Sequence, residues 1–325
     1  MGRYFVTGCA GFIGAYVVQL LLDAGHEVVG VDNLNDAYDP RLKDWRLENL
    51  NREEKFSFGR LDIVDMQALR SAWGAQEYDG VINLAARAGV RPSVRMPRVY
   101  YETNLLGALN VLDLAREHAV PKFVQASTSS LYGLENPRPY REDADTSRPL
   151  SPYAASKGAV ESLCHSYSYL HDMDITVLRY FTVYGPAGRP DMSIFRFIKW
   201  IAEGRPLILY GDGEQERDFT FVEDIARGTV AALRPMGYEV INLGGDRPVK
   251  MNALIKMIEA RLGKDALIEQ HEPAPGDMPA TWADITKAHR LLSWQPLVSL
   301  EQGLDLTVAW YLQEREWART VATSD

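Results

Sequence analysis

The sequence predicts an α/β fold: a doubly wound parallel sheet of the Rossmann type with a smaller mixed α/β lobe toward the C-terminal end. Short apolar strands and helical patterns alternate through the first 180 residues, as they do in parallel sheets. The strand expected at 26–32 is almost continuously apolar, as strands covered on both faces are. We therefore expect one domain over 1–180 plus about 218–245, and a second lobe over about 181–217 and 246–325.

Runs rich in β-branched and aromatic residues predict the strands of this sheet, at 4–7, 26–32, 56–61, 80–84, 122–126, 175–180 and 240–243. Apolar residues at helical spacing predict helices between them, at 12–24, 104–118 and 153–170. Beyond 181 we expect a helix at 193–203, a strand at 207–210, a glycine turn at 211–213 and a helix that begins near 222. The carboxyl ends of the parallel strands form the edge at which such sheets bind ligands.

Composition disfavours several classes of function. The chain has 325 residues, a formal net charge of −9 and two cysteines. A negative net charge disfavours nucleic acid as a partner, because binding it requires Lys and Arg to neutralise phosphates. Two cysteines without a CxxC motif predict a reducing, cytoplasmic compartment. The apolar runs are shorter than a membrane span, and a strand begins at Arg3, so we expect neither a membrane partner nor a signal peptide.

A glycine-rich loop between the first strand and the first helix predicts a dinucleotide site. The sequence TGCAGFIG over 7–14 places Gly8, Gly11 and Gly14 in a GxxGxxG pattern. Glycines let the backbone approach a pyrophosphate, and the following helix offers free N–H groups and the positive end of its dipole. Glycine triplets also occur in ordinary turns. The strand expected before this glycine loop and the helix expected after it favour a dinucleotide-binding role.

Asp32 indicates which dinucleotide is bound. It ends the second strand, 18 residues after Gly14, where a carboxylate accepts hydrogen bonds from a ribose diol and repels a 2′-phosphate. Residues 33–35 are Asn, Leu and Asn and supply no cation for that phosphate. The expected cofactor is therefore NAD rather than NADP. Asp62 and Ile63 are expected near the adenine ring, although Asp62 is equally suited to cap a helix.

Tyr153 and Lys157 predict an acid/base centre. They are four residues apart, so in a helix they share one face about one turn apart. A Ser/Thr cluster at 127–130 follows a strand and lies at the same edge of the sheet. A free tyrosine has a pKa of about 10, so acting as a base near pH 7 requires a decrease of about 3 units. A nearby ammonium and a positive nicotinamide ring would supply much of it.

These motifs resemble those of the nucleotide-sugar epimerase group of extended short-chain dehydrogenases/reductases. The matching segments occur in the family's order, at 7–14, Asp32, 83–86, Asn104, 127–133, Tyr153 with Lys157, 179–185 and 217–219. The resemblance implies that Tyr153 is the acid/base, that Lys157 is its electrostatic partner and a ribose ligand, and that Thr128 shares the substrate proton. It also implies a UDP-sugar substrate for the second lobe, and a homodimer formed through the helices at 104–118 and 153–170.

The resemblance implies two wider sets of contacts. The residues expected to bind NAD are Gly8, Gly11, Phe12, Ile13, Gly14, Asp32, Asp62, Ile63, Leu84, Ala85, Ala86, Asn104, Tyr153, Lys157 and Tyr180. The residues expected to bind the substrate are Arg91, Thr128, Ser129, Ser130, Tyr153, Thr182, Arg189, Met192, Arg217 and Asp277.

The residues after Thr128 indicate the reaction. Dehydratases of this group resemble TDEVYG there, and decarboxylases of nucleotide-activated uronic acids resemble TSEVYG. This chain has TSSLYG over 128–133 and lacks the carboxylate. Epimerisation at C4 does not require that carboxylate: it needs proton transfer at the 4-hydroxyl, hydride transfer to NAD, rotation of the 4-keto sugar and return of the hydride.

The segments 85–93 and 184–192 resemble those of the UDP-glucuronate 4-epimerases. The expected reaction is therefore the reversible conversion of UDP-glucuronate to UDP-galacturonate. The alternatives are a UDP-glucose/UDP-galactose or promiscuous UDP-hexose 4-epimerase and, less favoured, a UDP-glucuronate decarboxylase. A non-catalytic NAD-sensing regulator is a further alternative, which the presence of Thr128, Tyr153 and Lys157 disfavours.

A uronic acid poses a particular chemical problem. Its 4-keto intermediate is a β-keto acid, which loses CO2 when the C5–C6 bond aligns with the carbonyl π system. We expect Ser129, Ser130 and Arg189 to hold the carboxylate out of that alignment, because arginine suits a bidentate grip on carboxylate.

The remaining candidates carry separate expectations. Arg217 is expected on the diphosphate, and for Arg91 a ligand role and a surface role are equally weighted. Thr182 replaces the asparagine that hexose epimerases often carry, which fits the glucuronate branch. Ala187 replaces a bulky aromatic of that branch and predicts a wider pocket that also accepts UDP-glucose. The six histidines lack metal-ligand spacing, so no metal is expected.

Overall fold

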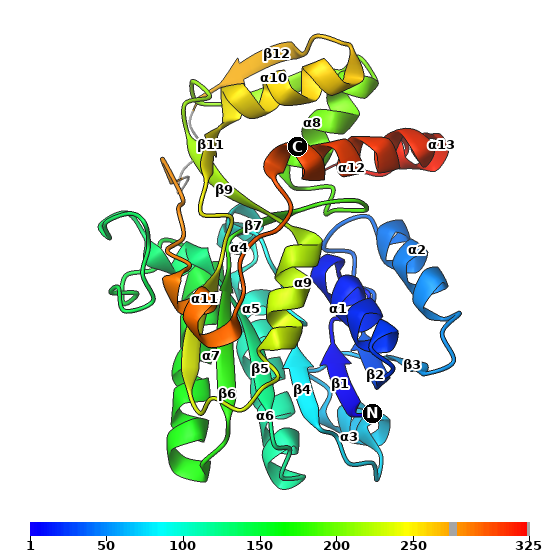
Figure 1. Cartoon of the computed structure of the whole chain (residues 1–325), viewed down its shortest axis with the longest axis vertical. Helices are drawn as coiled ribbons and strands as arrows, with labels where there is room; N and C mark the ends of the chain where they lie inside the picture. Colours follow the sequence, from blue (N-terminus) through cyan, green and yellow to red (C-terminus); the bar gives the residue numbers. More distant parts are fainter. Residues whose placement is uncertain (273–277, 324–325) are drawn as a thin grey trace.

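The structure, a computed structural model, describes residues 1–272 and 278–323. At its centre is a seven-stranded parallel sheet in the order β10-β6-β5-β4-β1-β2-β3, with helices on both faces (Figure 1). Its strands are β1 (Arg3–Thr7), β2 (Glu27–Asp32), β3 (Phe56–Arg60), β4 (Gly80–Asn83), β5 (Phe123–Thr128), β6 (Ile175–Tyr180) and β10 (Glu239–Leu243). The predicted doubly wound parallel sheet is confirmed. Because β1 pairs with both β2 and β4, the strand order reverses there and leaves a crevice at the carboxyl ends.

Each face of the sheet has its own hydrophobic core, because successive side chains of a strand point to opposite sides. Val6 packs in the core beneath α1 (Phe12–Asp23), α9 (Val222–Ala231) and α11 (Thr286–Leu292). Phe5 packs in the core beneath α3 (Met66–Trp73), α6 (Ala108–Glu117) and α7 (Pro152–His171). Both side chains are fully buried. Packing of helices on both faces therefore holds the strands, and the crevice at their carboxyl ends, in a fixed position.

A smaller lobe lies above the carboxyl ends of these strands (Figure 1). It contains a three-stranded sheet of β7 (Thr182–Tyr184), β9 (Glu216–Phe221) and β11 (Pro248–Lys250), and a pair formed by β8 (Pro206–Tyr210) and β12 (Leu267–His271). Its helices are α8 (Ser193–Ala202), α10 (Met251–Leu262), α12 (Leu300–Gln313) and α13 (Arg315–Ala318). Their apolar faces share one core with β8 and β9.

Two placements differ from the ranges predicted for the two lobes. The helix α11 packs on the large sheet, because Ala288 and Leu292 are buried in the same core as Ile241 of β10. Residues 218–221 belong to β9, and 219–221 pair with β7 of the small sheet. The division into two domains itself stays a prediction.

Several helical elements were not expected. The helix α2 (Arg41–Leu50) buries Leu42 and Leu47, but its charged residues obscure that pattern in the sequence. The helix predicted at 104–118 is formed by the π-helical turn η1 (Tyr101–Gly107) and α6, and two short helices that were not expected, α4 (Val90–Arg95) and α5 (Pro97–Tyr100), precede it. A short 3-10 turn, η2 (Ser129–Tyr132), follows β5.

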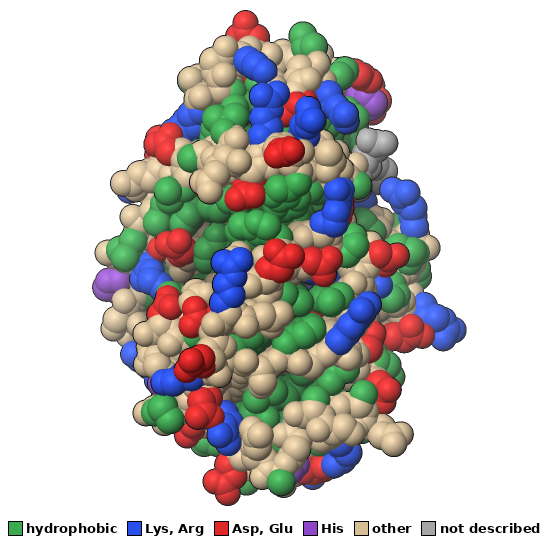
Figure 2. Space-filling model, turned by 90° about the vertical axis from the view of Figure 1, so that its right-hand side faces the viewer, with side chains coloured by type: hydrophobic (Ala, Val, Ile, Leu, Met, Phe, Trp, Pro, Cys, Tyr) green, Lys and Arg blue, Asp and Glu red, His purple; other side chains and the backbone are tan. Residues whose placement is uncertain are grey.

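The surface mixes charges of both signs. On the face drawn in Figure 2, Lys and Arg side chains alternate with Asp and Glu, and hydrophobic side chains gather in bands between them. Among the residues that the structure describes, no helix combines the length and apolar character needed to cross a membrane. The cytoplasmic compartment stays a prediction.

Candidate active site

The glycine loop joins the end of β1 to the N-terminus of α1. Gly8 has φ +69°, and a Cβ placed there would lie 2.7 Å from the backbone nitrogen of Ala85. A Cβ on Gly14 would lie 2.1 Å from the carbonyl oxygen of Gly8, so side chains at these positions would break the loop. No side chain caps the helix, so its first N–H groups point into the crevice and suit a pyrophosphate.

Asp32 ends β2 beside this loop, and it is 7% exposed. Its Oδ1 accepts the backbone N–H of Leu34 at 2.8 Å and lies 3.4 Å from Nζ of Lys43, whose side chain is 5% exposed. No cation directly follows Asp32 in the sequence, but α2 brings Lys43 beside it from 11 residues further along the chain. Next to it, Asn33 donates to Asp62 at 2.8 Å. The carboxylate of Asp32 is therefore held in place by Leu34 and Lys43 and fits a ribose diol.

Thr128, Tyr153 and Lys157 come together from two elements. Thr128 ends β5, and its Oγ1 accepts the backbone N–H of Ser130 at 3.1 Å. Ser151 caps α7 by accepting the N–H of Ala154 at 3.2 Å, which places Tyr153 in the first helical turn and Lys157 one turn later. The hydroxyl of Tyr153 is hydrogen-bonded to the side chain of Thr128.

The surroundings of this group set its protonation. Burial has the largest effect and leaves the pKa of Tyr153 above its ordinary value, while the hydrogen bond with Thr128 and the positive charge of Arg189 partly offset that rise. Burial lowers the pKa of Lys157 to about 8, although Cys164 and Glu161 oppose that shift. Sequence reasoning assigned the lowering of the tyrosine pKa to Lys157 and the nicotinamide, whereas the structure adds Arg189 as a contributor.

Arg189 lies on the wall of the same cavity as Tyr153. Its Nε and Nη2 donate to the two oxygens of Asp191, at 3.1 and 2.6 Å. A bidentate grip on a substrate carboxylate is expected of this guanidinium. In the structure its Nε edge is bonded to Asp191, and a contact with the substrate stays a prediction.

Arg46 of α2 connects the loops on which these groups lie, and sequence reasoning missed it. Nη1 donates to the carbonyl oxygen of Ala10 at 3.0 Å and to the hydroxyl of Tyr38 at 2.8 Å. Nη2 donates to the carbonyl oxygen of Ala187 at 2.6 Å. The side chain of Ala187 packs with Phe195 in a hydrophobic cluster and is not among the described residues of the cavity wall. The effect of Ala187 on the width of the sugar pocket stays a prediction.

One cavity of about 350 Å³ collects most of the predicted residues. From the expected NAD set, its wall contains Gly8, Gly11, Phe12, Ile13, Gly14, Asp32, Asp62, Ile63, Leu84, Ala85, Ala86, Tyr153, Lys157 and Tyr180. From the expected substrate set, it contains Thr128, Ser129, Ser130, Thr182, Arg189 and Met192. Residues that sequence reasoning did not assign also line it, among them Asn33, Tyr38 and Lys43.

Three predicted residues lie away from the described wall of this cavity. Asn104 bonds both backbone groups of Arg87, at 2.7 and 3.0 Å, and the hydroxyl of Ser156 at 2.9 Å. Its amide thus holds the loop after β4 against α7, and its contact with NAD stays a prediction. The guanidinium of Arg91 lies 4.1 Å from the ring centroid of Tyr210 in the smaller lobe.

The third is Arg217 on β9, whose Nη1 donates to the carbonyl oxygen of Glu216 at 2.8 Å. The predicted substrate residue Asp277 lies outside the described residues. Among those residues, no group of three or more His, Cys, Asp or Glu is arranged to hold a metal ion.

Comparison with known proteins gives a consistent result. The NAD dependent epimerase/dehydratase family matches residues 4–244. The UDP-glucuronate 4-epimerase of Thermodesulfobacterium geofontis is 52% identical over 322 residues, which are 99% of each chain.

Solved structures are similar as well. That of UDP-glucuronic acid 4-epimerase from Bacillus cereus, in complex with UDP-glucuronic acid and NAD, gives a TM-score of 0.90 at 39% identity and covers 96% of this chain and 99% of that one. That of UDP-glucose 4-epimerase from Thermotoga maritima, with UDP-glucose, gives 0.88 at 33% identity, with 96% and 99% covered.

Proposed function

The chain belongs to the NAD dependent epimerase/dehydratase family, and we propose that it interconverts UDP-glucuronate and UDP-galacturonate by reversible epimerisation at C4. The observation that carries this proposal is that Arg189 lies on the same cavity wall as Tyr153 and the glycine loop. A cation beside the acid/base suits a sugar that carries a carboxylate. A relative 52% identical is named a UDP-glucuronate 4-epimerase.

Tyr153 is the acid/base of this reaction. As a phenolate, its oxygen beside Thr128 accepts the proton of the sugar 4-hydroxyl, and the resulting phenol returns that proton after the sugar has turned. The ammonium of Lys157 and the guanidinium of Arg189 favour the phenolate form that accepts the proton. The glycine loop and Asp32 on the cavity wall would hold NAD, which would supply the acceptor and later the donor of the C4 hydride, without net oxidation.

The hydroxyls of Ser129 and Ser130 and Nη1 of Arg189 hold the C6 carboxylate. Ser130 is fixed by its bond to Thr128, and Arg189 by its pair with Asp191. Holding the carboxylate keeps the C5–C6 bond out of line with the carbonyl π system of the 4-keto sugar. The same contacts therefore select a uronate and prevent its decarboxylation.

A product assay tests this function. Purified protein is incubated with UDP-glucuronate and NAD, and the anomeric signals are followed by NMR. We expect UDP-galacturonate at a stable ratio without net NADH, and a decrease of about a hundredfold or more in kcat for Tyr153→Phe. Conversion to a UDP-pentose would assign the chain to the decarboxylases instead.

A UDP-hexose epimerase is the second candidate. A 33% identical protein whose structure contains UDP-glucose is named a UDP-glucose 4-epimerase. Conversion of UDP-glucose without conversion of UDP-glucuronate would establish this alternative and contradict the role given to Arg189.

We further propose that the protein is a homodimer. Apolar side chains of η1 and α7 are exposed, among them Leu106 at 44% and Leu170 at 67%, and a second copy would cover them. Leu106→Glu combined with Leu170→Glu is expected to give monomers by light scattering, whereas Leu312→Glu on α12 is expected to leave the mass unchanged. An unchanged mass for the double variant would contradict this interface.

A further inference from the structure

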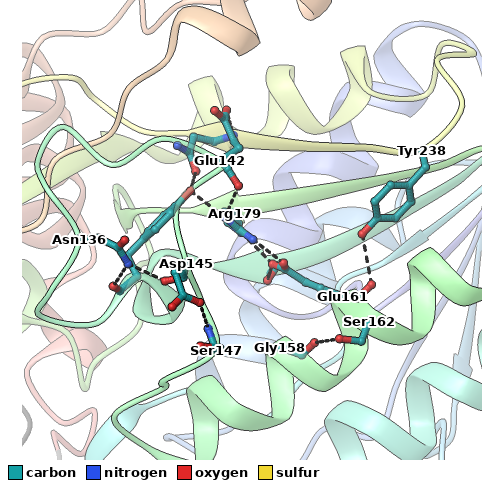
Figure 3. Close-up of polar contacts among 12 residues, drawn as sticks. Asn136, Glu142, Asp145, Ser147, Gly158, Glu161, Ser162, Arg179 and Tyr238 are labelled. Carbon is teal, nitrogen blue, oxygen red and sulfur yellow. Dashed lines mark hydrogen bonds and ion pairs between the residues drawn. The ribbon is translucent and has the colours of Figure 1, made fainter.

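A buried ion pair lies behind the acid/base residues. Nε and Nη2 of Arg179, on β6, donate to the two carboxylate oxygens of Glu161, on α7, at 3.0 and 2.7 Å. The two side chains are only 5% and 9% exposed. In Figure 3 the guanidinium lies between this carboxylate and the backbone of Glu142, to whose carbonyl oxygen Nη1 donates at 3.2 Å.

The pair is connected to the site through the chain itself. Glu161 is four residues after Lys157, so it lies one helical turn further along the same face of α7. Its Oε1 also accepts the hydroxyl of Ser127, and the next residue, Thr128, is the hydrogen-bond partner of Tyr153. One carboxylate thus faces both elements that carry the acid/base residues.

The far side of Arg179 is connected to the segment that follows η2. Nη1 donates to the hydroxyl of Tyr132 at 3.1 Å, which donates to Asn242 of β10 at 2.6 Å. Asn242 in turn donates to the carbonyl oxygen of Tyr140 at 2.9 Å. Arg179 therefore also anchors the residues that follow Ser129 and Ser130.

An uncompensated carboxylate at Glu161 would oppose the chemistry. A negative charge nearby disfavours the phenolate of Tyr153 and raises the pKa of both Tyr153 and Lys157. Because the pair is buried, solvent screens this effect little. The bidentate bond to Arg179 brings a full positive charge against the carboxylate and opposes its field at the site, although Glu161 still raises the pKa of Lys157.

We propose that Arg179 is a positioning residue for the reaction, which neutralises Glu161 so that Tyr153 and Lys157 work beside a pair of zero net charge. The inference rests on the proposed role of Tyr153. Removing either charge would then move the acid/base equilibrium, in opposite directions for the two partners. A role that is only structural predicts no such pattern.

Other groups also act on this centre. The titratable and charged side chains that face the acid/base pair or Glu161 from the elements around them are Arg189 and Asp191 after β7, Tyr100 on α5, Cys164 on α7, Tyr132 on η2, Glu142 in the following loop and Tyr238 before β10. They are unchanged in every variant below, so their contributions cancel in the comparison.

The test compares three variants with the wild type, as NAD-loaded protein. Glu161 follows Tyr153 by eight residues on α7, which is about 12 Å along the helix axis. A unit charge at that separation, in a medium of effective dielectric about 20, shifts a pKa by about one unit. Glu161→Gln is expected to move the pH profile of kcat/KM toward acid by that amount. Arg179→Gln is expected to move it toward alkali, and the double variant is expected to return it to the wild-type position.

A matched control uses a surface pair. Arg70 bonds Glu117 through two contacts of 2.6 and 2.8 Å, with side chains 48% and 35% exposed, so Glu117→Gln is expected to leave the profile unmoved. If Arg179→Gln does not fold, the proposal is still tested by the acid shift of the Glu161→Gln profile and by the reversal of that shift in the double variant. Profiles that change only in height, or two single variants that shift the same way, would overturn the proposal.

A second readout separates this inference from the proposed function. The NMR shift of the labelled phenol carbon of Tyr153, assigned with Tyr153→Phe, is titrated with pH in the same variants without substrate. We expect the pKa of Tyr153 to fall in Glu161→Gln and to rise in Arg179→Gln. If they occur in a protein that does not epimerise UDP-glucuronate, the proposed function fails and the role of Arg179 stands. If Tyr153 titrates identically in all variants while epimerisation is intact, the role of Arg179 fails.

Discussion

Nζ of Lys43 lies 3.4 Å from Oδ1 of Asp32, and the two side chains are only 5% and 6% exposed. The carboxylate expected to meet the cofactor ribose therefore has a cation beside it in the same cavity. The pair fixes the orientation of Asp32 and offers a donor as well as an acceptor to a ribose hydroxyl. Breaking it would leave a carboxylate buried without its cation.

The first prediction is that Lys43→Met weakens NAD binding. Loss of one charge-assisted hydrogen bond and of the partner that orients Asp32 is expected to raise the Kd for NAD by about tenfold or more. Isothermal titration of cofactor-free protein measures it. Lys250→Met, which removes an exposed lysine of the other lobe, is the control, and an unchanged Kd for Lys43→Met would contradict the role of this residue.

Arg46 gives the second prediction, because it bonds two carbonyl oxygens and one hydroxyl while 3% exposed. Arg46→Met leaves these acceptors buried without a donor and is expected to lower the free energy of unfolding by about 3 kcal/mol. Because the loops of Ala10 and Ala187 then separate, the Kd for NAD and the KM for the sugar are both expected to rise. Denaturant unfolding checks the first effect, with the exposed Arg52→Met as control; equal stability of the two variants would count against it.

The third prediction concerns the carboxylate contact of Arg189. Arg189→Ala removes a charged hydrogen bond, so the KM for UDP-glucuronate is expected to rise by about 10- to 100-fold while that for UDP-glucose changes less. The share of UDP-pentose among the products is expected to rise, because the C5–C6 bond is no longer held. Product ratios by NMR, with the exposed Arg234→Ala as control, test this, and an unchanged ratio would refute it.

The fourth prediction is a pH dependence set by Lys157, whose pKa burial lowers to about 8. A lowered pKa means that the ammonium loses its charge as the pH rises through about 8, well below the ordinary value of about 10.4. The phenolate of Tyr153 then loses electrostatic support, so kcat is expected to decline above about pH 8. In Lys157→Met the decline is expected to disappear and kcat to be low throughout; a decline that persists would assign it to another group.

The sequence predicted the central sheet well because its signals are local. The strands of the sheet are short apolar runs, and β1, the glycine loop and α1 follow each other directly in the chain. The acid/base residues were found for the same reason, since Tyr153 and Lys157 lie one turn apart on α7. Such local patterns can be recognised without knowledge of the tertiary contacts.

The missed residues depend on contacts between distant segments. Charged residues obscure the apolar stripe of α2, so no local pattern places Lys43 beside Asp32 or Arg46 beside Ala187. Asn104 was assigned to the cofactor by family order, but the π-helical turn η1 points its amide at Arg87 and Ser156. Side-chain pairs such as Arg189 with Asp191 likewise become visible only when the loop after β7 is folded.

The most direct test of the central claim follows the hydrogen on C4. UDP-glucuronate deuterated at C4 is incubated with the protein and NAD in ordinary water, and the product is analysed by NMR. Epimerisation by removal and return of one hydride predicts UDP-galacturonate that retains the deuterium at C4 and its carboxylate at C6. Product that has exchanged the deuterium for solvent hydrogen, or that has lost CO2, would contradict the account.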